Sequence, residues 1–255
     1  MLEFKDITVT FRSKAKRVAA VDHVSLAIAP GEFVSLVGTS GCGKSTLLNV
    51  ASGLVQPTSG QARYRGEDIK GPHRALGLVP QADSLFPWRT TVQNITLGLT
   101  FRGLKRREAE ARAVDLLAQV GLQGFEKSYP SELSGGMRQR VNIARALAID
   151  PDVLLMDEPF GALDAFTRVE LQRMLLTLVS ELKKTVLFVT HDVAEAIVMS
   201  DRIVVMGARP SRIVKIADIQ HDDGPRDPLR VQERPDYATT HGDIIDALYG
   251  GKDEL

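Results

Sequence analysis

The sequence predicts an α/β fold in which a largely parallel sheet is interrupted by a helical insert. Short apolar segments at residues 32–38, 153–156, 186–189 and 203–206 have the length and composition of buried strands. Between the first two of them, residues 91–149 show helical periodicity. Strands that alternate with helical segments are typical of a parallel sheet, so these segments are expected to form one core.

Two strand-like segments precede that core. Residues 4–11 alternate apolar and polar side chains, and residues 21–28 follow after a polar, basic stretch. We interpret this stretch as a solvated hairpin loop rather than an anion site, because charge runs mostly form solvated surface. Its basic residues are Arg12, Lys14, Lys16 and Arg17. The N-terminal segment is therefore expected to form an antiparallel β subdomain.

Further helices are predicted from periodicity. In residues 106–121 apolar side chains recur at helical spacing with charges between them, and Gly121 suits the helix C-terminus. The apolar positions are Ala113, Val114, Leu117 and Val120. After residue 208 the chain is rich in Asp, Pro and Arg, and a last helix is expected at residues 237–249.

Composition limits the possible partners and compartments. The chain has 255 residues, enough for one large domain or two small ones. Its 32 basic residues balance 32 acidic ones, so charge gives no reason to expect nucleic acid or an anionic lipid surface as the main partner. Cys42 is the only cysteine, which precludes an intrachain disulfide and fits a reducing compartment.

The sequence shows no targeting or spanning segment. No basic stretch followed by an apolar run opens the chain, and no apolar run approaches the roughly 18 residues of a spanning helix. We therefore expect neither a secretory signal nor a transmembrane helix. Residues 252–255 read KDEL, an endoplasmic-reticulum retention signal. Without an entry signal that address is not read, so we interpret the match as coincidence.

A glycine-rich segment follows the strand at residues 32–38. Residues 38–45 read GTSGCGKS and fit G-x-x-x-x-G-K-[ST] before a helical segment at residues 46–52. The glycines let several backbone N–H groups face one phosphate chain, and the helix adds its positive end. Lys44 is expected to reach the β- and γ-phosphates, and the Ser45 hydroxyl to bind Mg²⁺. The expected nucleotide-binding residues are Gly38, Thr39, Ser40, Gly41, Cys42, Gly43, Lys44, Ser45 and Thr46.

Asp157 supplies the acid that such a site requires. It ends the apolar strand at residues 153–156, where a carboxylate can orient Mg²⁺ through water. A strand-end turn residue is the alternative interpretation. Together, the phosphate loop and this acid indicate a nucleotide-binding protein and leave kinases and GTPases open.

Five further motifs narrow the family. They are LSGGMRQR at residues 133–140, Gln81, the pair Asp157–Glu158, GALD at residues 161–164 and THD at residues 190–192. In this order, and over residues 3–220, the chain resembles ATP-binding-cassette (ABC) proteins, so the kinase and GTPase interpretations fall away. The sequence departs from the commonest family pattern at two positions: Met137 stands where glutamine is frequent, and Pro80 where an aromatic is frequent. Neither difference removes a group that the chemistry needs.

The resemblance implies a domain layout. It implies a single ABC ATPase domain over residues 1–255, with a P-loop NTPase (RecA-like) core at residues 1–81 and 152–220. The inserted helical subdomain, with the signature motif, would span residues 82–151. Residues 221–255 would be a short C-terminal extension.

The resemblance also implies roles for single residues. Glu158 would polarise the attacking water, His191 would contact the γ-phosphate, and Gln81 would sense the metal or the water. With Lys44 these are the expected catalytic residues. The expected metal ligands are Ser45, Gln81 and Asp157. Phe11 stands where the family stacks an aromatic, more commonly tyrosine, on adenine; an ordinary core position is the alternative.

A second copy of the chain is expected to complete each site. Ser134 is a good N-cap, and Gly135 and Gly136 open a helix whose N–H groups can bind an anion. In the family that anion is the γ-phosphate held by the other subunit, and Asp164 of the D-loop also approaches the nucleotide. The resemblance therefore implies a homodimer with ATP and Mg²⁺ between two cassettes.

Finer resemblance indicates the ATPase of an importer. Residues 71–79, 85–95 and 161–168 are similar to the nitrate, sulfonate and taurine group. This implies transmembrane permease subunits as partners, a periplasmic or extracellular solute-binding protein indirectly, no nucleic acid, and a peripheral place at the cytoplasmic face of the membrane. The chain has one phosphate loop and no heptad run, unlike translation and repair relatives. A cluster-assembly ATPase stays the alternative.

Two further hypotheses concern the reactivity of Cys42 and the contact with a permease. Cys42 precedes a helix N-terminus beside Lys44, which favours thiolate and predicts inactivation by a maleimide with protection by MgATP; steric shielding is the alternative. Phe86, Pro87 and Trp88 form an apolar run shortly after Gln81. They are predicted either to contact a permease helix or to pack the helical insert onto the core.

Overall fold

The computed structural model describes residues 1–12, 17–221 and 226–250. Lys14 and Lys16 of the predicted hairpin loop, and residues 252–255, lie outside the described residues. None of the helices in the described part of the chain is both long and apolar enough to cross a membrane.

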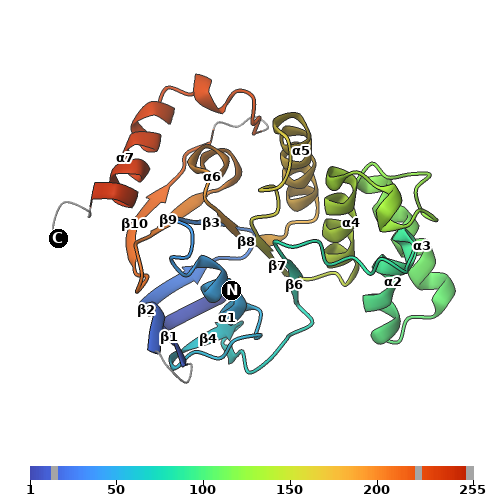
Figure 1. Cartoon of the computed structure of the whole chain (residues 1–255), viewed down its shortest axis with the longest axis horizontal. Helices are drawn as coiled ribbons and strands as arrows, with labels where there is room; N and C mark the ends of the chain where they lie inside the picture. The colour runs from blue at the N-terminus through green and yellow to red at the C-terminus, as the bar shows by residue number, and fades with distance from the viewer. Residues whose placement is uncertain (13–16, 222–225, 251–255) are drawn as a thin grey trace. The chain divides into compact units, whose positions relative to one another are not determined.

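The chain divides into two compact units (Figure 1). The first unit combines residues 1–73 with residues 183–255, and the second unit consists of residues 74–182. The helical insert predicted for residues 82–151 lies wholly within the second unit.

An antiparallel sheet opens the first unit. It consists of β1 (Leu2–Arg12), β2 (Arg17–Ile28), β4 (Ser59–Tyr64) and β5 (Glu67–Asp68), in the order β2-β1-β4-β5. The predicted antiparallel β subdomain is thus confirmed. Its regular alternation is interrupted by a register shift between Phe4 and Ile7. There Asp6 takes φ 53°, and His23 on β2 takes φ 52°, both in the left-handed region that a side chain disfavours.

Parallel strands form the centre of the first unit. β3 (Phe33–Gly38) pairs in parallel with β8 (Thr185–Thr190) and with β9 (Arg202–Met206), and β10 (Ile213–Asp218) adds to β9 in antiparallel orientation. Every residue of β3 and β8 is buried. Such continuous burial requires cover on both faces, which is why these strands are apolar throughout. The strands predicted at residues 32–38, 186–189 and 203–206 are confirmed.

Three α-helices accompany these strands in the described part of the first unit: α1 (Lys44–Ala51), α6 (Val193–Met199) and α7 (Tyr237–Tyr249). A 3₁₀ turn, η2 (Val231–Glu233), precedes α7. The helix predicted at residues 237–249 is confirmed, and α7 packs against α6, β9 and β10.

The second unit is mainly helical. Two parallel strands, β6 (Leu76–Val79) and β7 (Val153–Asp157), accompany α2 (Thr91–Phe101), α3 (Arg106–Gln119), the 3₁₀ turn η1 (Pro130–Glu132), α4 (Gly135–Ala148) and α5 (Ala165–Glu181). Gly121 takes a positive φ just after α3, as its position predicted. Of the apolar residues at helical spacing, Ala113 and Leu117 are buried on α3, whereas Val114 is exposed.

A hydrogen-bonded cluster fixes the chain after β10 to the end of α6. His221 Nε2 lies 2.7 Å from the Ser200 carbonyl oxygen, so this nitrogen carries a proton and donates it. Arg234 Nη1 donates to His221 Nδ1 at 3.2 Å, which requires the neutral ring. Arg226 pairs with Asp201 beside them. Burial lowers the pKa of His221, and the cations Arg226 and Arg234 lower it further, against the opposing effects of Ser200 and Asp201.

This cluster is expected to make stability depend on pH. Because the folded-state pKa of His221 lies below its ordinary value, the unfolded chain takes up the proton first. The contribution is therefore present above about pH 6.5 and is lost as the pH falls through the folded-state pKa. His221→Gln should flatten the slope of the unfolding free energy between about pH 7 and 5, measured by urea denaturation. His73→Gln is the control, and an unchanged slope in His221→Gln would contradict the assignment.

Candidate nucleotide-binding site

The predicted phosphate loop connects β3 to α1 in the first unit. Gly41 and Gly43 take φ +75° and +130°, conformations that glycine adopts without steric cost. A Cβ on Gly43 would lie 2.6 Å from the Ala20 carbonyl oxygen on β2. The loop therefore closes onto β2 at a point where only glycine fits.

Lys44 lies inside this loop. Its ammonium donates to the carbonyl oxygens of Gly38 at 2.8 Å and Thr39 at 3.2 Å, and the residue is only 4% exposed. Burying a cation is costly unless hydrogen bonds compensate, and these two carbonyl groups provide such compensation. The result is a buried positive charge held by two backbone carbonyl groups of the loop.

The start of α1 adds further donors. Gly43 is its N-cap and makes no side-chain cap hydrogen bond, so the first N–H groups of α1 are not capped from there. Ser45 and Thr46 follow in the first turn and are half-buried. Backbone N–H groups, the helix dipole and the Lys44 ammonium together favour an anion at this end of α1.

His191 lies at the end of the neighbouring strand. Val37 of β3 pairs with Thr190 of β8, so the phosphate loop and His191 follow adjacent parallel strands at the same sheet edge. Two hydrogen bonds hold the turn that follows His191. Asp192 caps α6 by accepting from Glu195 N at 3.0 Å, and the Thr190 hydroxyl bonds the buried Glu195 carboxylate. His191 itself is exposed.

Phe11 lies near the end of β1, opposite Val18 of β2. Its side chain is 48% exposed, so the alternative interpretation of Phe11 as a core residue is wrong. An exposed ring of this kind offers a face on which an aromatic base can stack.

In the second unit the acidic motif ends β7. Asp157 is the last residue of the strand and, like Glu158, is half-buried. Gln81 Nε2 donates to Glu158 Oε2 at 3.2 Å, so the structure brings these two predicted residues together. Glu158 takes φ 43°, and Gly161 N donates to its carbonyl oxygen at 3.2 Å. A non-glycine residue in this region costs on the order of 1–3 kcal/mol, so the surrounding contacts have to hold Glu158 in place.

The signature segment opens α4 as predicted. Ser134 is the N-cap, and its hydroxyl accepts from Met137 N at 3.2 Å. A Cβ on Gly136 would lie 2.4 Å from Thr167 Cγ2 on α5, so the second glycine allows the two helices to approach. Asp164 caps α5 by accepting from Thr167 N at 3.0 Å, and this backbone hydrogen bond lowers the pKa of its carboxyl.

Comparison with known proteins now identifies the family. A family model described as "ABC transporter" matches residues 21–161, more than half of the chain. The chain belongs to the ABC transporter family.

Curated relatives are similar to this chain over most of its length and most of their own. The taurine import ATP-binding protein TauB of Rhizobium johnstonii is 47% identical over 86% of this chain and 84% of its own. The aliphatic sulfonates import ATP-binding protein SsuB of Bacillus cereus is 44% identical over 85% of both. Among solved structures, the ATP-binding cassette MJ0796 is similar in its dimeric post-hydrolysis state bound to ADP and Pi. Its sequence is 33% identical, and the TM-score is 0.78 with 87% of this chain and 100% of that chain covered.

The predicted site residues of this cassette are distributed over both units. Phe11, Lys44, Ser45 and His191 belong to the first, and Gln81, Ser134, Asp157, Glu158 and Asp164 to the second. None of the sequence motifs indicated Arg209, whose guanidinium donates hydrogen bonds to the Gly41 carbonyl of the phosphate loop. An arginine in a turn after a strand carries no periodic or motif signal that could have indicated this contact.

Cys42 is expected to react slowly in the folded protein. The residue is only 2% exposed, and its sulfur would lie 2.8 Å from a Cβ on Gly38, so it faces into the loop. This burial favours the shielded alternative over ready inactivation by a maleimide. Mass spectrometry after N-ethylmaleimide treatment should show rapid labelling in urea and much slower labelling of the native chain. Equal rates in both states would contradict the buried position.

Proposed function

We propose that this cassette is the ATP-hydrolysing subunit of an importer, which binds MgATP between two copies of the chain and couples hydrolysis to uptake of a small solute. The observation that best supports hydrolysis is the end of β7, where Gln81 bonds Glu158 beside Asp157. A carboxylate held in place by a side-chain amide is suited to orient a water molecule as a general base.

The phosphate loop supplies binding and charge stabilisation. Lys44 and the N-terminus of α1 attract the β- and γ-phosphates, and Phe11 offers its exposed ring to the adenine. The hydroxyl of Ser45, the amide of Gln81 and the carboxylate of Asp157 provide the oxygen ligands that Mg²⁺ prefers. Bound there, Mg²⁺ would neutralise charge on the phosphates. His191, exposed beyond β8, is assigned to the γ-phosphate.

A second copy is assigned to the signature segment. The exposed Ser134 and Gly135 begin α4, where N–H groups favour an anion. Asp164 begins α5 and is also exposed. Residues that bind phosphate from exposed helix starts suit a nucleotide shared with another subunit. The dimeric MJ0796 structures support this arrangement.

The solute is assigned to the class of organic sulfonates and related oxyanions, such as taurine and nitrate. Similarity to the taurine and aliphatic sulfonate import proteins supports this class. The partners would then be transmembrane permease subunits and, through them, a solute-binding protein. The cassette would lie at the cytoplasmic face of the membrane, held there by the permease.

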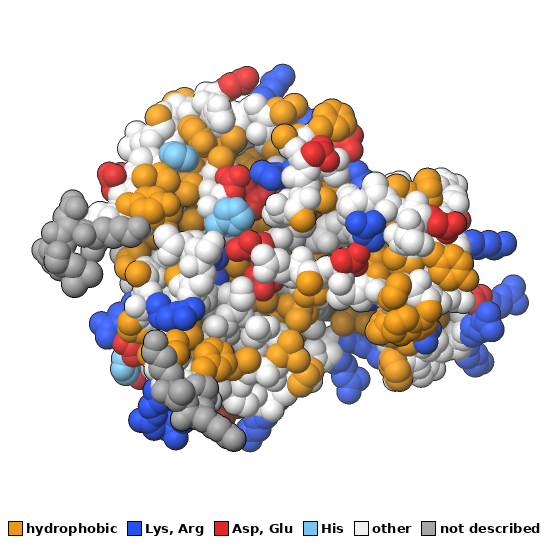
Figure 2. Space-filling model, viewed as in Figure 1, with side chains coloured by type: hydrophobic (Ala, Val, Ile, Leu, Met, Phe, Trp, Pro, Cys, Tyr) orange, Lys and Arg blue, Asp and Glu red, His pale blue; other side chains and the backbone are white. Residues whose placement is uncertain are grey.

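The permease contact is assigned to the loop between Gln81 and α2. Trp88 is 70% exposed and packs against the half-buried Phe86, with 5.6 Å between the ring centroids and a tilt of 55° between the ring planes. Figure 2 shows hydrophobic side chains gathered on the surface of the region that Figure 1 labels α2 and α3. The exposure of Trp88 argues against the alternative in which it packs the helical insert onto the core. An apolar patch on the surface, rather than a single exposed ring, is what favours a partner, so the assignment rests on Trp88 together with the apolar side chains gathered in this region.

Glu158→Gln is expected to abolish turnover while MgATP still binds. The amide keeps the shape of the side chain and removes the base, so kcat should fall by about 10²–10⁴-fold. Because a site that cannot hydrolyse stays closed, sizing chromatography with MgATP should show a stable dimer. Glu181→Gln, on the exposed end of α5, is the control and should keep wild-type activity. Hydrolysis by Glu158→Gln at the wild-type rate would refute the base assignment.

Trp88→Ala is expected to distinguish a permease contact from packing within the cassette. Because the ring is exposed, the melting temperature and basal ATPase of the isolated chain should change little. Co-purification with co-expressed permease subunits should fall. Leu229→Ala, which shortens an exposed apolar side chain in the first unit, serves as the control. A loss of about 3–5 kcal/mol in stability would instead mean that Trp88 belongs to the core.

A further inference from the structure

The turn at residues 207–212 joins β9 to β10 and is anchored on β2. Gly207 N donates to the Arg212 carbonyl oxygen at 2.9 Å, which closes the turn. Ser211 N donates to the Ala20 carbonyl oxygen at 3.1 Å, and Asp22 N donates to that of Ser211 at 2.9 Å. The turn therefore has a fixed position relative to β2.

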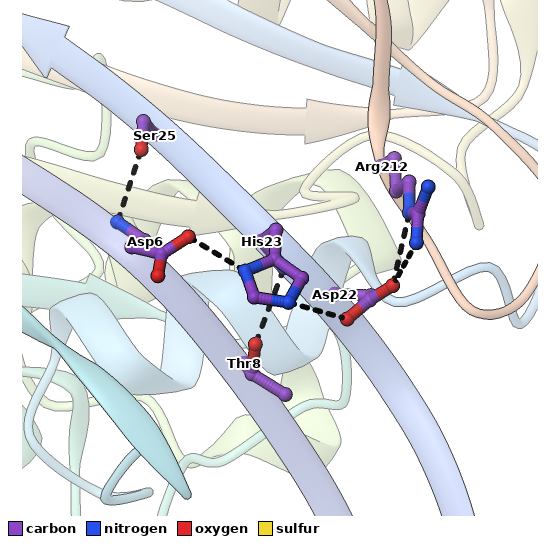
Figure 3. A network of polar contacts seen from close by, with 6 residues as sticks. All are labelled: Asp6, Thr8, Asp22, His23, Ser25 and Arg212. Atoms are coloured by element: carbon purple, nitrogen blue, oxygen red, sulfur yellow. Dashed lines mark hydrogen bonds and ion pairs between the residues drawn. The ribbon is translucent and has the colours of Figure 1, made fainter.

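A side-chain pair adds to this anchor. Arg212 Nε and Nη2 both donate to Asp22 Oδ2, at 2.9 and 2.5 Å (Figure 3). Asp22 in turn lies beside His23, whose Nδ1 is 2.7 Å from Asp6 Oδ1. This network lies on β1, β2 and the turn, and none of the contacts drawn in it involves the phosphate loop.

Arg209, on the same turn, does reach the phosphate loop. Its Nε donates to the Gly41 carbonyl oxygen at 3.1 Å, and its Nη2 donates to the same oxygen. Nη2 also lies 3.6 Å from the place that a Cβ on Gly41 would take. The guanidinium therefore covers the Gly41 peptide group.

The Gly41 carbonyl determines where the next N–H group points. In a trans peptide the C=O of Gly41 and the N–H of Cys42 point in opposite directions. The Cys42 N–H donates to the Thr39 carbonyl oxygen at 3.2 Å, within the loop. A rotation of this peptide group would direct a carbonyl oxygen, instead of an N–H donor, toward the loop interior, and an oxygen there repels phosphate. The bond from Arg209 opposes that rotation.

We propose that Arg209 is a positioning residue of the nucleotide site, which holds the Gly41–Cys42 peptide group with its carbonyl toward Arg209 and its N–H bonded to the Thr39 carbonyl within the loop. The inference rests on the proposed nucleotide site. Arg209 is assigned a role through the backbone of the loop, because its guanidinium donates to the Gly41 carbonyl oxygen. Its charge strengthens the bond to the carbonyl, since hydrogen bonds that involve an ionised group are about twice as strong as neutral ones.

Titration of MgATP and MgADP into the full chain tests this role. Arg209→Met keeps the aliphatic stem and removes the donors, so Kd should rise about 3–10-fold, the size expected for one exposed charged hydrogen bond. The value of kcat at saturating MgATP should stay within about twofold, because bound phosphate itself orders the loop. Arg209→Lys, which can donate one bond, should recover most of the affinity.

Arg212→Met provides the matched control. It makes the same substitution three residues away and removes the side-chain contact with Asp22, whereas the backbone bonds of Ser211 still hold the turn on β2 and no contact with the phosphate loop is lost. Its Kd should equal that of the wild type, and thermal unfolding of every variant is measured in parallel. A wild-type Kd in Arg209→Met, or an equal rise in Arg212→Met, would overturn the positioning role. A wild-type chain that binds no MgATP would overturn the proposed function and this inference together.

Discussion

The parallel pairing of β3 with β8 is the constraint on which the first unit's part of the site depends. Both strands are buried along their whole length, and their register brings Val37 opposite Thr190. A shift of one residue would exchange the side chains of two covered faces, so the close packing on both faces specifies the register. Because the two strands run in the same direction, the phosphate loop and His191 emerge at one edge. Local sequence then only has to shape the two turns.

The two units use backbone conformation in different ways. The phosphate loop needs left-handed backbone at Gly41 and Gly43, and glycine provides it without strain while leaving N–H groups accessible to a phosphate. Glu158 needs similar backbone but also a carboxylate, which glycine lacks. The strain at Glu158 is tolerated because its carbonyl and its carboxylate both accept hydrogen bonds, from Gly161 and Gln81. These two hydrogen bonds hold the Glu158 side chain and backbone in one conformation.

Sequence patterns predicted the strands and motifs well, and side-chain orientation poorly. Apolar runs identified β3, β7 and β8, because strands buried on both faces are apolar throughout. The pattern of apolar residues identified α7, because a helix with one buried face repeats its apolar side chains at helical spacing. The strands β4, β5, β6 and β10 were not predicted. Of these, β4, β5 and β10 are short and partly exposed, and β6 has only four residues, so they carry little of that record. The phosphate-loop motif indicated that Cys42 lies in the loop, but the direction of its thiol depends on Gly38 and Met206, which close tertiary packing brings near. The exposure of Trp88 likewise depends on the surrounding surface.

Attraction of a nucleotide to this chain has to be local, because its 32 basic and 32 acidic residues cancel. Three positive features converge on the phosphate loop in the first unit: the Lys44 ammonium, the N-terminus of α1 and the Arg209 guanidinium. They act on different atoms. Lys44 and α1 present donors to the loop interior, whereas Arg209 binds a carbonyl oxygen on the outside. A peptide group polarised on one side by a cation presents a stronger N–H donor on the other. The outer charge therefore strengthens the bond from the Cys42 N–H to the Thr39 carbonyl, which holds the shape of the loop.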